Sequence, residues 1–238
     1  DCTFLELPGG VAWLIDGGSS DVEQVGSGRI ASFLQWKGVR RLEGVVLSHS
    51  DADHTNGIQE ILEGELVPVG CLVLPRATAG WEEWAALRMA AEERSVPVYT
   101  MAAGEAFQRG AVSFTCLYPA GTAEGEDTNS LSLTLLVEWE AFSGLFPGDL
   151  GTEQELLFAG QWQPVSLLKV GHHGSRSSSG PAFLEALSPQ AAVISCGADN
   201  AYGHPHPETL ERLEQGGSRV YRTDRQGAVR FRMRKGRM

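Results

Sequence analysis

Long apolar runs and paired cysteines are both missing from this chain of 238 residues. No run approaches the ~20 apolar residues of a membrane-spanning helix. The four cysteines, Cys2, Cys71, Cys116 and Cys196, form no CxxC pair. We interpret them as small buried residues, because a domain of this size needs no disulfide framework. The chain also lacks an initiator methionine and a signal-peptide pattern and opens in what reads as a strand, so we expect a fragment of a longer protein.

Internal repeats and Pro- or Ser-rich linkers are absent as well, which favours one domain over residues 1–238. Short apolar runs bounded by glycine alternate with runs of helical spacing, and this alternation predicts an α/β protein. Strands are expected at 2–7, 10–18, 44–49, 111–119, 130–139, 143–149, 165–171, 191–197 and 228–233. Helices are expected at 21–38, 57–64, 80–95, 152–160, 181–188 and 206–217, with Thr152 as one N-cap.

Positive charge is scarce except at the C-terminal end of the chain. Residues 219–238 carry a net charge of +7, which leaves −18 for the rest of a chain whose total is −11. A strongly acidic surface does not coat nucleic acid indiscriminately. The basic segment is therefore either a solvated strand and tail or a local phosphate-binding strip.

Histidine is rare too, and its distribution is informative. All six histidines fall in three short clusters, and each cluster follows a predicted strand. Asp149 likewise ends the predicted strand at 143–149. Because open α/β sheets bind ligands at the carboxyl ends of their strands, this placement predicts a functional site. The clusters are His49 with His54, His172 with His173, and His204 with His206.

The segment "HSDADH" at 49–54 has the composition of a metal site. In a loop leaving a strand, His49 and Asp51 point to one side and can hold one ion. Asp53 and His54 are adjacent and turn toward a second position. Imidazole nitrogen and carboxylate oxygen are the ligands that divalent transition ions use. Asp149 comes about a hundred residues later, and a carboxylate there can bridge two ions ~3.5–4 Å apart.

The combined motifs resemble the metallo-β-lactamase superfamily. They look most similar to the soluble C-terminal domain of ComEC-type DNA-uptake proteins, through "WLIDGG", "VVLSHSDADHTNG", "NSLSL", "FPGDL", "LLKVGHHGSRSSS", "YGHPHPETLERL" and "YRTDRQGAVRF". The resemblance implies an αββα sandwich with a dinuclear metal site. It also implies that the chain starts at the last aspartate of the family's opening "DVGQGD" strand, and that Asp16 supports a turn under the site.

Two departures from the superfamily pattern bear on the metal. Asp51 stands where the wider superfamily has histidine, and no histidine lies between His54 and His172. Asn129, or water, is the candidate for the missing third ligand of the first ion. Because both changes replace nitrogen by oxygen, we predict two divalent ions with manganese favoured, zinc or magnesium being the alternatives.

The remaining assignments follow the order of residues in related phosphodiesterases. His173 or His172 is expected to approach the scissile phosphate, and His204 to be the final metal ligand, with His206 as its alternative. In "GSRSSSG", Ser175 and Arg176 are candidate phosphate contacts. Lys169 is either a phosphate contact or a buried structural lysine.

Function follows from the resemblance as a set of expectations. The leading one is a metal-dependent DNA phosphodiesterase, an exonuclease that degrades the non-transported strand during natural transformation. Its partners would be single-stranded DNA and the remainder of a membrane channel protein, with no nucleotide cofactor. The domain would lie on the extracytoplasmic face of the inner membrane. The alternatives are a small-molecule hydrolase acting on phosphocholine esters, other phosphodiesters or lactones, and a catalytically degenerate domain that binds DNA or a partner.

Overall fold

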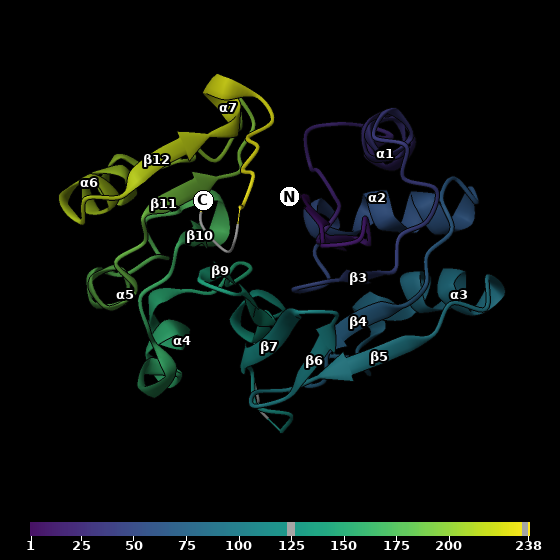
Figure 1. The fold of residues 1–238 in the computed structure, drawn as a ribbon, viewed down its shortest axis with the longest axis horizontal. Coiled ribbons are helices and arrows are strands. Elements are labelled where there is room, and N and C mark those ends of the chain that lie inside the picture. Colours follow the sequence, from purple (N-terminus) through teal and green to yellow (C-terminus); the bar gives the residue numbers. More distant parts are fainter. Residues whose placement is uncertain (123–126, 235–237) are drawn as a thin grey trace. The chain divides into compact units, whose positions relative to one another are not determined.

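The protein is represented by a computed structural model, which describes residues 1–122, 127–234 and 238. The chain forms two compact units. Unit 1 comprises Asp1–Ala102 and Pro119–Leu133, and unit 2 comprises Ala103–Tyr118 and Thr134–Met238. Each unit contains one β-sheet with its own helices, labelled in Figure 1. Because the chain crosses between the units three times, neither unit is a single continuous stretch of sequence.

Unit 1 contains a five-stranded sheet in the order β1-β2-β3-β4-β5. β1 is antiparallel to β2, and the other neighbouring strands are parallel. β2, β3 and β4 are buried along their whole length, as parallel strands covered by helices usually are. The strands are β1 (Thr3–Glu6), β2 (Ala12–Ile15), β3 (Gly44–Val46), β4 (Leu72–Pro75) and β5 (Val98–Met101).

The helices of unit 1 bury their apolar faces against this sheet. Leu34, Ile58, Ile61 and Leu87 join strand residues such as Leu72 in one hydrophobic core. Burying side chains of this size contributes roughly 1.5–3 kcal/mol each. The helical segments are a π-helix (Gly26–Ala31), α1 (Ser32–Trp36), α2 (Ala52–Glu63), a 3₁₀ turn (Glu82–Trp84), α3 (Ala85–Glu93) and a second 3₁₀ turn (Asn129–Leu131).

Unit 2 contains a seven-stranded mixed sheet in the order β12-β11-β10-β9-β8-β7-β6. β9 to β12 run parallel, so their carboxyl ends share one edge of the sheet. β6 to β9 are an antiparallel meander. The strands are β6 (Ala106–Arg109), β7 (Val112–Tyr118), β8 (Thr134–Trp139), β9 (Phe142–Phe146), β10 (Leu167–Lys169), β11 (Ala191–Ile194) and β12 (Arg219–Arg222).

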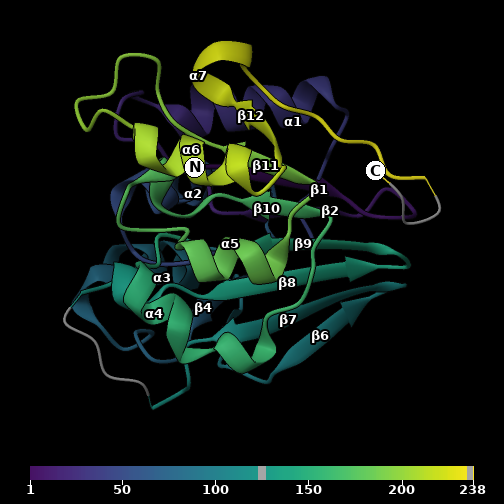
Figure 2. The ribbon, with the colours of Figure 1, turned by 90° about the vertical axis from the view of Figure 1, so that its left-hand side faces the viewer.

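The larger helices of unit 2 cover one face of its sheet, which is turned to the viewer in Figure 2. Phe158, Trp162 and Phe183 form an aromatic cluster that joins the end of α4 to α5, with ring centroids 5.4–6.4 Å apart. The helical segments are α4 (Thr152–Leu157), α5 (Pro181–Leu187), α6 (Pro207–Gln215), α7 (Thr223–Gln226) and 3₁₀ turns at Ala159–Gln161 and Gly171–Gly174.

The predicted α/β architecture, with helices packed on sheets, is confirmed, and the strands form two sheets. The assignment of residues 1–238 to one domain taken from a larger membrane protein stays a prediction. Within the described residues, no helix combines the length and the apolar content that crossing a membrane requires.

Several local predictions were wrong. No strand was predicted at β4, β5, β6 or β12, and the strand expected at 130–139 begins only at Thr134, after a 3₁₀ turn. Cys2, expected to be buried, is exposed.

The helix expected at 57–64 begins at Ala52, inside the "HSDADH" segment, so its last two ligand candidates lie on a helix. The N-cap of α4 is Gly151, and Thr152 is the first helical residue. Residues 228–233 form no strand, and the last strand is β12. β12 takes the sheet position because it hydrogen-bonds in register with β11, a tertiary pairing that alternation of residue types does not specify.

Candidate metal centre

Unit 1 gathers the four ligand candidates of the "HSDADH" segment at the carboxyl end of β3. Asp51 is the extended N-cap of α2, and Asp53 and His54 lie in the first turn of that helix. His49 Nε2 lies 3.9 Å from Asp51 Oδ2. His54 Nε2 lies 3.7 Å from Asp53 Oδ2. The segment thus forms two histidine–aspartate pairs, although Asp53 and His54 reach theirs from a helix rather than from the expected loop.

Asp16, at the end of β2, sets the proton positions of both rings. Its carboxylate accepts hydrogen bonds from Ser48 N–H (2.7 Å), Ser48 Oγ–H (2.9 Å) and His54 Nδ1–H (2.9 Å). Since Ser48 Oγ donates its one proton to Asp16, it accepts from His49 Nδ1–H at 2.9 Å. Both neutral rings therefore carry their proton on Nδ1 and present an unprotonated Nε2, the arrangement of metal-ligating histidines.

The charge of Asp16 is consistent with this role. Burial by itself raises the pKa of Asp16. The positive charge that His54 and His49 carry when protonated, together with the hydrogen bonds from His54 and Ser48, outweighs burial and holds the pKa below its usual value. Asp16 is therefore the anionic acceptor at the base of the network. Its predicted location at a turn under the site matches this position; sequence reasoning missed its direct contact with His54.

Asn129, the candidate third ligand, lies close to the same segment. Its neighbour Thr128 donates a hydrogen bond from Oγ1 to Asp51 Oδ1 (2.7 Å). Leu133 N–H donates to Ser48 O (2.7 Å), which ties this stretch to the end of β3. Asn129 Oδ1 is buried, and no hydrogen-bond donor among the described residues reaches it. A buried carbonyl oxygen of this kind suits a cation.

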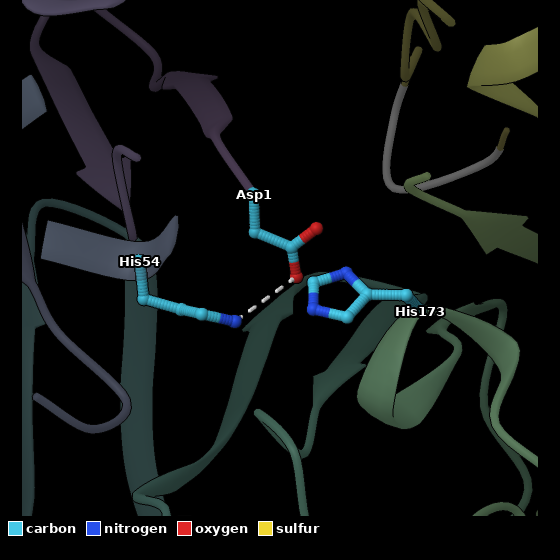
Figure 3. Close-up of side chains that lie close together, drawn as sticks. All are labelled: Asp1, His54 and His173. Atoms are coloured by element: carbon cyan, nitrogen blue, oxygen red, sulfur yellow. Dashed lines mark ion pairs between the residues drawn. The ribbon is translucent and has the colours of Figure 1, made fainter. Parts of the chain in front are cut away.

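Asp1 also belongs to this part of unit 1. Its side chain is 5% exposed, and Oδ2 lies 3.9 Å from His54 Nε2. Figure 3 shows the carboxylate directed at the edge of the His54 ring. Sequence reasoning treated Asp1 only as the end of a strand motif. The sequence offered one signal for this role, an aspartate that lies two residues before the first strand, β1.

Unit 2 gathers a second set of candidates at the carboxyl ends of β9, β10 and β11. Asp149 is buried, with its Oδ2 3.2 Å from His173 Nε2 and 3.9 Å from His172 Nε2. His173 Nδ1 donates to Ser195 O at 3.0 Å, because a carbonyl oxygen can only accept. The neutral His173 ring therefore presents an unprotonated Nε2 toward Asp149. A divalent ion between them would relieve the repulsion between this lone pair and the carboxylate.

The backbone that carries the two histidines is unusual. His172 and His173 both adopt left-handed conformations, with φ of 46° and 53°, and Gly174 follows at 83°. Such conformations cost about 1–3 kcal/mol for a residue with a side chain and occur at functional sites. Gly174 is required for a further reason, because a Cβ there would lie 2.6 Å from Pro205 Cβ.

His204 and His206 are sorted by their hydrogen bonds. His206 Nδ1 accepts from Arg176 N–H (3.2 Å), so the neutral ring carries its proton on Nε2. This hydrogen bond stabilises the loop that contains Arg176. His204 stacks against His173 with ring centroids 6.0 Å apart. Burial first, then repulsion from His173, His172 and His206, lowers the pKa of His204 to about 4. His204 is thus neutral at physiological pH, the state in which histidine binds metal ions.

The three candidate phosphate contacts have different surroundings. Lys169 is buried and donates from Nζ to Val170 O (3.1 Å), as the structural alternative requires. Ser175 is buried, with its Oγ 2.9 Å from Ser177 Oγ. Arg176 has an exposed side chain, 4.0 Å from Glu208. Only Arg176 therefore offers an accessible cationic group.

The basic C-terminal segment is mostly accessible where it is described. Arg225, Arg230, Arg232 and Arg234 are exposed, whereas Arg222 pairs with Asp224 at 2.6 Å. The charges at 235 and 237 lie outside the described residues. This part of unit 2 is a candidate phosphate-binding strip.

Comparisons with known proteins agree with this geometry. The family described as "Beta-lactamase superfamily domain" matches residues 14–178. The chain is 34% identical over 202 residues to "ComE operon protein 3" of Bacillus subtilis, covering 84% of this chain and 26% of that protein. It is 34% identical over 227 residues to "Competence protein ComA" of Neisseria gonorrhoeae, covering 94% and 29%. The chain thus spans less than a third of these curated relatives.

A solved structure shares the fold at low sequence identity. It is CmlA, a diiron β-hydroxylase from Streptomyces venezuelae, with a TM-score of 0.62 and 15% identity, covering 93% of this chain and 51% of that one.

Proposed function

Because this chain belongs to the β-lactamase superfamily, we propose that it is a metal-dependent hydrolase that cleaves DNA phosphodiester bonds during DNA uptake. The observation that carries the proposal is the pair of ligand sets. His49 and His54 in unit 1 and His173 in unit 2 each present an unprotonated Nε2 toward a carboxylate. The competence-protein relatives, of which the chain spans 26% and 29%, support DNA as the substrate.

We further propose that two divalent ions bind the residues of these sets, and that Asp149 is one of their carboxylate ligands. Such ions lower the pKa of a water nucleophile and neutralise charge on the phosphate. His49, Asp51, Asp53 and His54 would hold the ions from unit 1. The high share of oxygen donors supports manganese over zinc, with Asn129 Oδ1 as a further oxygen ligand.

The chain's own residues divide the remaining work. We assign His173 and His204 to the metal centre, because hydrogen bonding fixes His173 and burial keeps His204 neutral. This assignment moves His173 from the phosphate-contacting role that residue order suggested. His172, with 32% of its side chain exposed, is free to meet a phosphate oxygen or the leaving group. Arg176 and the exposed arginines would guide the strand.

The relatives also support the proposed setting of the domain. A competence protein of which this chain spans less than a third leaves room for a membrane channel in the same polypeptide. We therefore propose that the domain is attached to such a channel on the extracytoplasmic face of the inner membrane, with incoming single-stranded DNA as its partner.

The proposal is tested by digesting end-labelled single-stranded DNA with and without Mn²⁺. Wild type should cut only with the ion, and Asp149→Ala should lose at least about 100-fold in rate. Asp199→Ala, a matched change at an exposed aspartate of the same unit, should cut like wild type. Ion-dependent hydrolysis of a lactone or of bis-nitrophenyl phosphate without DNA cleavage would favour the small-molecule alternative. Ion-independent DNA binding without cleavage of any substrate would favour the degenerate domain.

A further inference from the structure

Two carboxylates face one nitrogen of His54 in unit 1. Asp53 Oδ2 lies 3.7 Å from His54 Nε2, and Asp1 Oδ2 lies 3.9 Å from the same atom. The His54 side chain is fully buried, and that of Asp1 is 5% exposed. Figure 3 shows the approach of Asp1 to His54 as a dashed line. The three side chains come from the chain start and from the first turn of α2.

The polarity of the His54 ring makes this arrangement selective for a cation. In the neutral ring, whose Nδ1 proton is donated to Asp16, Nε2 directs a lone pair toward the oxygens of Asp53 and Asp1. Two carboxylates and a lone pair repel one another, most strongly where water is excluded. A divalent ion among the three groups would convert each repulsion into an attraction.

The distances suit such an ion. Nitrogen and oxygen donors bind it at about 2.0–2.2 Å, so two ligands of one ion lie about 3.0–3.6 Å apart, depending on the coordination geometry. The observed separations of 3.7 and 3.9 Å exceed this range by only a few tenths of an ångström. Each of the two carboxylates therefore lies close to the spacing expected for sharing an ion with His54 Nε2.

The main chain holds Asp1 in this position. The terminal amino group of Asp1 donates to Gly18 O (2.8 Å) and Asp53 O (2.7 Å), and the Asp1 carbonyl oxygen accepts from Gly18 N–H (2.9 Å). Gly18 permits this because a Cβ there would lie 2.5 Å from Ala52 O and 2.7 Å from the carbonyl carbon of Asp53. The backbones of the two aspartates are thus linked directly, which preorganises their carboxylates.

We propose that Asp1 is a metal ligand that binds the same ion as Asp53 and His54. The inference rests on the proposed function, which places an ion at His54, and adds a ligand outside the "HSDADH" segment. With Asp1, unit 1 supplies two oxygen donors and one nitrogen donor to this ion. Such a set favours manganese or magnesium more strongly than the segment alone.

The test is calorimetric titration of the metal-free protein with Mn²⁺. Wild type should bind two ions. Asp1→Asn should weaken one of them by at least about 100-fold and leave the other within a few fold, because loss of a ligand should exceed the 10–100-fold cost of losing a supporting hydrogen bond. Asp21→Asn, at an exposed aspartate of the same unit, should match wild type. Circular dichroism checks that each variant is folded.

A second variant separates ligation from a purely structural effect. Asp1→His keeps a donor but replaces oxygen by nitrogen, so the affinity ratio of Zn²⁺ to Mn²⁺ at the weakened site should rise. Two ions bound as tightly by Asp1→Asn as by wild type would overturn the assignment of Asp1, and so would wild-type protein that binds no ion at His54. Normal ion binding by wild type without DNA cleavage would instead refute the nuclease proposal and leave Asp1 as a ligand.

Discussion

Glu155 in α4 provides a sharp test of how the loop at 171–180 is held. The residue is 1% exposed, and its carboxylate accepts hydrogen bonds from the backbone N–H groups of Ser179 (2.6 Å) and Gly180 (2.9 Å). Burial raises the pKa of Glu155 from 4.5 to about 7, although the two hydrogen bonds and Arg212 oppose the shift. Glu155 is therefore a buried acid that anchors the end of the histidine-bearing loop.

The raised pKa makes stability depend on pH in a defined direction. A group whose folded pKa lies above its unfolded value stabilises the protein fully below the unfolded pKa, and this contribution is lost as pH rises through the folded pKa. For Glu155 the window runs from about pH 4.5 to about pH 7. At 1.36 kcal/mol per pKa unit, the whole shift corresponds to about 3 kcal/mol of unfolding free energy.

Glu155→Gln should remove this pH-dependent contribution to the unfolding free energy. The amide cannot ionise, but its nitrogen cannot accept the second N–H, so at pH 5 the variant should be less stable by about 1–3 kcal/mol. Between pH 5 and pH 8 the difference should shift by about 2–3 kcal/mol in favour of the variant, because only wild type carries the cost of ionisation.

Urea denaturation of metal-free protein at both pH values measures this difference. Glu153→Gln, at an exposed site on the same helix, should change little at either pH. A wild-type–variant difference that is equal at pH 5 and pH 8 would refute the raised pKa. A shift that favours wild type at pH 8 would show that the two N–H donors outweigh burial.

Two further substitutions test the supporting structure of unit 1. Asp16→Asn should lower Mn²⁺ affinity 10–100-fold without removing a ligand, because the amide no longer holds the Nδ1 proton of His54; unchanged affinity in a calorimetric titration would argue against this control of the ring. Gly44→Ala should destabilise the protein by about 1–3 kcal/mol, since its Cβ would lie 2.4 Å from the buried Trp13 ring. Gly28→Ala, where a Cβ has open space, should leave the thermal midpoint nearly unchanged, and equal losses in both glycine variants would contradict the packing argument.

Local sequence patterns were sufficient to predict the architecture and most of the ligand candidates. The apolar runs before His49, Asp149 and His172 are strands, and each polar cluster lies at a carboxyl end, as short-range patterning predicted. Helix boundaries were predicted less well, because α2 begins within the polar segment. Asp51 has the extended backbone of an N-cap there, and its side chain accepts from Thr128, a residue 77 positions away.

Residues whose role depends on distant partners were not predictable from the sequence. Asp1 and Asp16 are ordinary aspartates in the sequence, and only the fold brings them to opposite edges of the His54 ring. His204 and His206 differ because a backbone N–H 30 residues away from His206 occupies its Nδ1.

The difference between what the sequence predicted and what only the structure showed has a physical cause. Hydrophobic periodicity and chain stereochemistry act over a few residues, so the sequence by itself determined most of the strands and helices and the polar clusters that follow the strands. Proton positions, burial and pKa shifts depend on groups that lie as much as 57 residues apart in the sequence, as the surroundings of His54 and Glu155 show. Those properties were decided only by the tertiary structure, because electrostatic and hydrogen-bond energies depend on distance in space and not along the chain.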